Sequence, residues 1–154
     1  MRTVEIPNDI LLSHVRQLIA EGHTVTIRVK GVSMRPCLEN GRDNVVLAAA
    51  TTIKKRDVVL AECSPGRYVL HRVIKIKGDT LTLMGDGNLK ETERCRATDV
   101  AGVVIALLRG GKRVDCRSRK WKIYSGIWLT LRPGRRILLA IYRSFRKREK
   151  AYDR

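Results

Sequence analysis

Ser33 and His71 are the two side chains whose types and surroundings best suit covalent chemistry. Ser33 lies in the stretch Gly31-Val32-Ser33-Met34-Arg35-Pro36, where a glycine permits positive φ and a proline restricts the residue before it. A serine on such a bend can present both its hydroxyl and its backbone N–H to one carbonyl group. It needs a neighbouring base, and a neutral histidine such as His71 can accept its proton. An ordinary turn serine and an ordinary strand histidine are the alternatives.

The order and spacing of three residues resemble a known family. His71 follows Ser33 by 38 residues, and Asp86, in a Gly-Asp-Gly-Asn stretch, follows His71 by 15. This arrangement resembles the type I signal peptidases, in the branch that uses histidine instead of lysine as the base. The same clan includes the self-cleaving SOS repressors, whose nucleophile bend is similar to Gly31–Met34. The resemblance covers residues 25–108.

The resemblance implies a serine endopeptidase that forms an acyl-enzyme without a metal or a cofactor. Ser33 is then the nucleophile, His71 is the general base, and Asp86 orients His71 or supports the site. The backbone N–H of Ser33 contributes to the oxyanion hole, and Gly31 and Met34 shape the bend. Family members often carry a hydroxyl two residues before the nucleophile, where this chain has Gly31. The implied substrate is a peptide or protein with small side chains next to the scissile bond.

The acidic member of the site is open to more than one interpretation. Asp86 could be a plain turn residue, because aspartate is common in turns. The family has further aspartates soon after this motif, whereas this chain has Glu91. The roles of Glu91 and Asp86 are therefore undecided at this level. Ala101-Gly102 is similar to the bond that the repressors cut in themselves, but it lies in a predicted buried strand and is interpreted as structural.

Short alternating or apolar segments predict a mainly β fold. Residues 24–30 alternate polar and apolar side chains, which is the period of a half-buried strand. Further strands are predicted at 45–49, 58–62, 68–76, 81–84 and 100–108, separated by turn residues. Because helices and strands do not alternate, we expect an antiparallel sheet. The resemblance implies that this sheet is coiled and barrel-like.

Both ends of the chain are predicted to be helical. Leu11, Val15 and Leu18 recur at helical spacing before Gly22. On both sides of Pro133-Gly134, apolar residues recur every three or four positions, which predicts two amphipathic helices; these residues are Trp121, Tyr124, Trp128, Leu131, Leu138, Ile141, Tyr142 and Phe145. We therefore divide the chain into a β domain with an N-terminal helix at 1–116 and a basic helical extension at 117–154.

Positive charge is concentrated near the C-terminus. The formal net charge is +17, and residues 109–154 hold 16 basic and 3 acidic side chains. Basic amphipathic helices with tryptophan suit an anionic membrane surface. The candidate contacts with a membrane or another anion are Trp121, Trp128, Arg135, Arg136 and Arg146. The alternative is that the apolar stripe packs on the β domain while the charges remain in solvent.

The leading functional hypothesis is thus a peptidase of cytoplasmic location, or one peripheral to the inner membrane face. The alternative is a non-catalytic or self-cleaving regulatory member of the clan whose basic tail binds nucleic acid. That partner is less favoured, because residues 1–30 predict one helix and no helix-turn-helix. The four cysteines are widely spaced, which favours free thiols over a zinc site. We find neither a secretory signal nor an apolar run long enough to span a bilayer.

Overall fold

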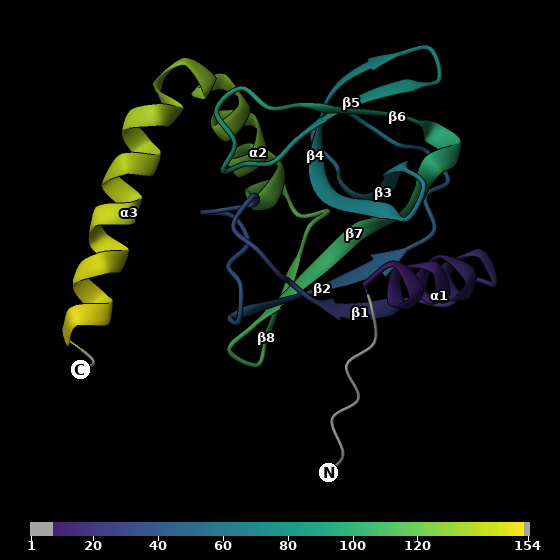
Figure 1. Cartoon of the computed structure of the whole chain (residues 1–154), viewed down its shortest axis with the longest axis horizontal. Helices are drawn as coiled ribbons and strands as arrows, with labels where there is room; N and C mark the ends of the chain where they lie inside the picture. Colours follow the sequence, from purple (N-terminus) through teal and green to yellow (C-terminus); the bar gives the residue numbers. More distant parts are fainter. Residues whose placement is uncertain (1–7, 153–154) are drawn as a thin grey trace.

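The structure, a computed structural model, describes residues 8–152 as an eight-stranded antiparallel sheet with three α-helices (Figure 1). Residues 1–7, on which the expectation about a secretory signal partly rests, lie outside the described residues. The elements in chain order are α1 (Asn8–Ala20), β1 (Val25–Arg28), β2 (Asp43–Ala48), β3 (Val58–Ser64), β4 (Arg67–Lys77), β5 (Thr80–Met84), β6 (Glu93–Arg96), β7 (Val100–Arg109), β8 (Lys112–Asp115), α2 (Arg119–Thr130) and α3 (Arg135–Tyr152). Single 3₁₀ turns precede β7 (Ala97–Asp99) and α3 (Arg132–Gly134).

The sheet confirms the prediction of a mainly β, antiparallel fold but is open. Its strand order is β1-β2-β7-β3-β4-β5-β6, and β8 pairs with the end of β7 beyond β3. Register shifts at Val46/Leu47, Leu60/Ala61 and Val73/Lys75 mark bulges, which bend a sheet locally. The expected barrel-like closure is corrected, because over residues 8–152 the sheet is not closed into a barrel. An apolar groove lies between β1 and β4, described below.

Side-chain alternation along β4 decides which residues reach the site. Val69 and Val73 face a small core cluster shared with β3, β5 and β6. Leu70 faces the larger cluster, which also takes in α1, β1, β2 and β7. Since successive strand residues point to opposite faces, His71 shares the face of Val69 and Val73, whereas Arg72 shares the face of Leu70. The two neighbours therefore serve different parts of the site.

The helices occur where the sequence predicts them, with a break at Pro133-Gly134. On α1, Val15 and Ile19 are buried. Gly102 of β7 leaves room for the Ile19 side chain, because a Cβ on Gly102 would lie only 2.7 Å from Ile19 Cδ1. α2 and α3 stand on the side of the molecule away from α1 (Figure 1). Among residues 8–152, none of the helices is long and apolar enough to cross a membrane.

Candidate active site

The bend that carries Ser33 is held from two sides. Gly31 has φ +78°, a left-handed conformation that glycine adopts readily. The carbonyl oxygen of Ser33 accepts a 2.7 Å hydrogen bond from Gly87 N. Met34 is buried, and its Sδ lies 3.5 Å from Asp86 N. The stretch after β5 therefore supports the serine directly.

The two glycines around Asp86 are required by this contact. A Cβ on Gly85 would collide with the carbonyl oxygen of Ser33. A Cβ on Gly87 would lie 2.8 Å from the carbonyl oxygen of Val32, closer than Cβ atoms normally approach. The Gly-Asp-Gly pattern is thus explained by backbone packed against backbone, with Asp86 as the one side chain between.

Ser33 and His71 meet as the sequence predicted. His71 Nε2 lies 3.2 Å from Ser33 Oγ, which is hydrogen-bond distance. Ser33 is half-buried and can still be reached, whereas His71 is only 7% exposed. Burial lowers the pKa of His71 below its ordinary 6.5, because the charged imidazolium loses hydration, while the nearby carboxylates of Glu93 and Asp86 oppose that shift. The ring is therefore held neutral and able to accept a proton at neutral pH.

The other ring nitrogen of His71, Nδ1, lies in the interior of the protein. Nδ1 is buried and makes no hydrogen bond among the described residues. Of the charged groups around the ring, Glu93 acts most strongly on its pKa and Arg67 opposes it. Arg67 and Glu93 are themselves paired, with Nη2 2.7 Å from Oε1.

Glu93 reaches the same sheet face as His71 through the strand register. Glu93 pairs with Leu83, and Leu83 pairs with Val73, which lies two residues after His71. Paired residues share a face, as do residues two apart. Sequence reasoning considered Glu91, which is exposed, and missed Glu93 because β6 was not predicted. The alternation in Glu93–Arg96, around Cys95, was the available signal.

The structure does not bring the Asp86 carboxylate to His71. Both of its oxygens instead accept hydrogen bonds from Arg72, each 2.7 Å long, and both side chains are buried. Arg72 also donates to Ser125 Oγ at 2.6 Å and to the Arg56 carbonyl at 3.0 Å. Asp86 is therefore a support of the site, which was one of its two expected roles, and the orienting role is corrected.

α2 and the start of α3 hold the stretch that supports Ser33. Trp128 is buried and donates from Nε1 to the Asp86 carbonyl oxygen at 3.1 Å. Arg135, 2% exposed, donates to the Asn88 carbonyl at 3.2 Å, and its guanidinium lies 5.2 Å from the Trp128 ring centroid. Trp121 is half-buried, with the Arg72 guanidinium 6.0 Å from its ring centroid.

Most of the residues proposed as membrane contacts are thus turned toward the protein. Trp121, Trp128 and Arg135 pack as just described, and Arg146 lies 3.2 Å from the buried carboxylate of Glu39. The assignment of Trp128 and Arg135 to a membrane surface is corrected, because both are buried, whereas Trp121 and Arg146 are partly exposed. Arg136 alone of the five is exposed.

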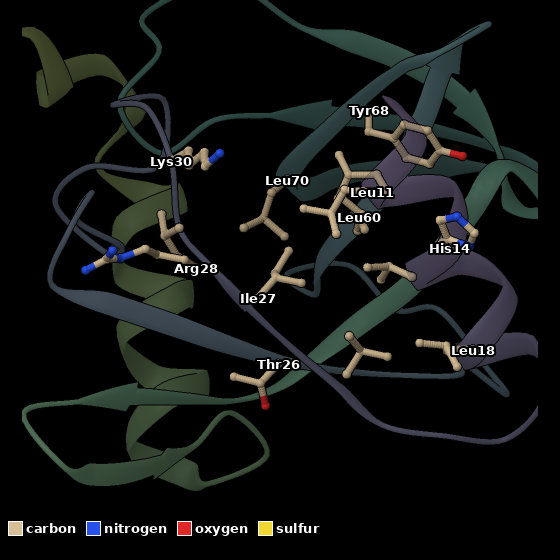
Figure 2. A pocket seen from close by; sticks show the side chains of 14 residues that line it. Leu11, His14, Leu18, Thr26, Ile27, Arg28, Lys30, Leu60, Tyr68 and Leu70 are labelled. Atoms are coloured by element: carbon tan, nitrogen blue, oxygen red, sulfur yellow. The ribbon is translucent and has the colours of Figure 1, made fainter. Parts of the chain in front are cut away.

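An apolar groove of about 470 Å³ runs between α1, β1 and β4 (Figure 2). Its walls include Leu11 and Leu18 of α1, Ile27 of β1, and Tyr68 and Leu70 of β4. One end reaches Lys30, three residues before Ser33, and β4 leads from Leu70 directly into His71. β1 is an edge strand of the sheet, so its outer backbone groups are available to pair with an extended peptide.

The backbone N–H of Ser33 belongs to the same residue as the candidate hydroxyl and can act as a hydrogen-bond donor. The backbone N–H of Ser33 donates to no backbone carbonyl among the described residues. Over residues 8–152, no three His, Cys, Asp or Glu side chains form a group that could hold a metal ion.

No family model matches the chain, and no curated protein shows significant similarity to it.

Proposed function

We propose that this protein is a serine endopeptidase of the signal-peptidase clan, with Ser33 as nucleophile and His71 as general base. The observation that carries the proposal is the 3.2 Å separation of His71 Nε2 and Ser33 Oγ, two side chains 38 residues apart in the chain. The lowered pKa of His71 supports its role, because a base must be unprotonated to act. The coiled signal-peptidase form of the β fold is part of the same proposal.

In the proposed reaction, His71 Nε2 accepts the hydroxyl proton while Ser33 Oγ bonds to the carbonyl carbon of the substrate. The oxyanion that forms accepts a hydrogen bond from the Ser33 backbone N–H. As the C–N bond breaks, the imidazolium returns its proton to the leaving amine and an acyl-enzyme remains. A water molecule, deprotonated by His71, then attacks the ester and releases Ser33.

The substrate in this proposal is a peptide extended along the free edge of β1. Backbone hydrogen bonds to β1 provide affinity, and alternate side chains enter the groove beside Ile27 and Leu70. A leader-like segment of a protein fits, because the groove is lined mainly by apolar side chains. The family resemblance adds a small side chain next to the scissile bond.

We further propose that the enzyme acts in the cytoplasm or at the inner membrane face. All four cysteines are free thiols, as is usual in a reducing compartment. Burial raises the pKa of Cys95 and of Cys116 to about 12, so both remain protonated and unreactive at neutral pH.

The test is covalent labelling of Ser33 by a fluorophosphonate, followed by mass spectrometry of the labelled peptide. The wild-type chain should be labelled at Ser33, and labelling should be lost in Ser33→Ala and strongly slowed in His71→Ala. Ser13→Ala, an exposed serine of α1, is the matched control and should label normally. Equal labelling of wild type and His71→Ala would contradict the proposal and favour the regulatory alternative.

Self-cleavage at Ala101-Gly102 has no support. Both residues are buried within β7, which pairs with β2 on one side and β3 on the other. Ser33 could reach that bond only if the centre of the sheet opened.

A further inference from the structure

The solvent side of α2 and α3 carries large apolar side chains that the fold does not use. Ile123 and Ile127 are 60% and 54% exposed, and Ile137, Ile141 and Phe145 are 68%, 49% and 62% exposed. Residues four apart lie on one helix face, so the members within each helix form a stripe. We call these five residues the exposed stripe. Large apolar residues exposed in this number on two successive helices mark an interaction surface.

Different residues attach the two helices to the sheet. Trp128 binds the Asp86 carbonyl, and Leu139 is buried. The Tyr142 hydroxyl donates to Glu39 at 2.8 Å, and Arg146 pairs with the same carboxylate. Since these contacts come from the inner faces, substitutions in the exposed stripe should leave the fold intact.

Exposed basic side chains are frequent along both helices. Arg119, Lys120 and Lys122 of α2, and Arg136, Arg143 and Lys147 of α3, are exposed. Within residues 8–152, none of these six has an acidic side chain as an ion-pair partner. Their long stems can lie along an apolar surface while the charged ends reach polar groups.

A shallow basic pocket of about 190 Å³ lies where α3 meets the Ser33 bend. It is lined by Arg35, Tyr142, Arg143, Arg146 and Lys147. Glu39 neutralises part of this charge, because Arg35 and Arg146 both lie within 3.2 Å of its carboxylate. Because Tyr142 and Arg146 also attach α3 to Glu39, this pocket lies on the inner side of the helix and is separate from the exposed stripe.

We propose that this face of α2 and α3 docks on the surface of an anionic phospholipid bilayer. The exposed stripe enters the interfacial region, and exposed basic side chains of both helices pair with anionic headgroups. This inference concerns binding and is independent of the proposed peptidase activity.

Two other occupants fit the same surface less well. A nucleic acid would use aromatic rings for stacking. Trp121 and Trp128 instead contact Arg72 and the Asp86 carbonyl within the fold. Four of the five stripe residues are isoleucine, and Phe145 is the single aromatic member. A second copy related by a two-fold axis would bring two positively charged faces together, which is electrostatically unfavourable.

The test is co-sedimentation of the full chain with vesicles of phosphatidylcholine plus phosphatidylserine, and with vesicles of phosphatidylcholine alone. We expect binding to the mixed vesicles, little binding to the neutral ones, and release by salt. The triple variant Ile137→Ser, Ile141→Ser, Phe145→Ser should lose most of this binding. Arg119→Gln with Lys120→Gln, which lie one turn from Ile123, should weaken it by roughly fivefold for each charge removed.

Matched controls remove the same chemistry elsewhere on the surface. Ile76→Ser with Val114→Ser removes exposed apolar residues of β4 and β8, and Lys77→Gln with Arg94→Gln removes exposed charges. Both should bind like the wild type, and circular dichroism should show that every variant is folded. Wild-type binding by the triple variant would overturn the proposal.

The competing occupants give opposite results in the same experiment. If the triple variant loses binding to a single-stranded oligonucleotide but keeps binding to vesicles, the surface is a nucleic-acid site and the proposal fails. If it abolishes a dimer seen by analytical ultracentrifugation while vesicle binding persists, the surface is a subunit interface and the proposal also fails.

Discussion

The guanidinium group of Arg72 and the carboxylate of Asp86 form two hydrogen bonds of 2.7 Å inside the protein, where neither side chain is more than 1% exposed. Arg72 follows His71 on β4, and Asp86 lies between the two glycines that pack on the Ser33 bend. The pair therefore joins the strand that carries the base to the segment that supports the nucleophile.

Breaking this pair should destabilise the fold. Arg72→Met or Asp86→Ala leaves one charge buried without its partner, which costs about 3–5 kcal/mol of unfolding free energy. The double variant Arg72→Met, Asp86→Leu removes both charges and should lie closer to the wild type than either single variant. Urea unfolding measures all three. If the Asp86→Ala chain is as stable as the wild type, Asp86 does not support the fold in this way.

The pH dependence of peptide cleavage should follow the protonation of His71. The base works when neutral, so kcat/KM should rise with pH through the His71 pKa and then level off. Because burial lowers that pKa below 6.5, the half-maximal rate should occur below pH 6.5. A half-maximal rate well above this pH, or a profile without an acidic limb, would exclude His71 as the base.

Two substitutions should move this profile in opposite directions. Glu93→Gln removes a negative charge that raises the pKa of His71, so the acidic limb should shift to lower pH. Arg67→Gln removes a positive charge that lowers it, so the limb should shift to higher pH. The rates across pH 4 to 9, an interval of roughly two units or more on either side of an ordinary histidine pKa, measure both shifts. Unchanged profiles would mean that the Arg67–Glu93 pair has a structural role only.

A methyl group on Gly85 should disturb Ser33. Gly85→Ala forces the new Cβ into the Ser33 carbonyl oxygen, and such overpacking costs typically about 1–3 kcal/mol. Fluorophosphonate labelling should slow as well, because the bend must shift. Gly134→Ala is the control, since nothing lies within 4 Å of its added Cβ. If both variants behave like the wild type, the close backbone contact is not needed.

The approach of Ser33 and His71 was predicted from the order and spacing of their motifs, and local signals place each residue within its element. Alternation places His71 on one face of a strand, and Gly31 marks the bend before Ser33. β6 was missed, because Glu93–Arg96 contains one apolar residue and pairs only along β5. Closure of the sheet depends on contacts between β1 and distant strands, which no local pattern encodes.

The faces of the C-terminal helices were harder to predict for a different reason. Helical spacing reveals an apolar stripe, but α2 has apolar residues on two sides, with Trp128 inward and Ile127 outward. Which side packs is decided by partners far away in the sequence, such as the Asp86 carbonyl for Trp128 and the Glu39 carboxylate for Tyr142. Charge counting could not separate buried Arg135 from exposed Arg136.

Narrowing the groove between α1 and β4 should weaken substrate binding. Leu11 lines the groove and is 38% exposed, so Leu11→Trp can extend into the space without entering the core. A misfit of one methylene or more in an apolar pocket changes kcat/KM for a substrate by roughly tenfold or more. We therefore expect a rise of that size in KM for an extended apolar peptide. The rate of labelling of Ser33 by the small fluorophosphonate should be unchanged, because the dyad is not touched.

The matched control for this prediction is Ile10→Trp. Ile10 lies next to Leu11 on α1 and is 47% exposed, but it is not among the residues that line the groove. It should leave both KM and labelling at wild-type values. If Leu11→Trp also leaves KM unchanged while the peptide is still cleaved at Ser33, the substrate does not occupy this groove. An equal effect of the two variants would point instead to a general change in α1.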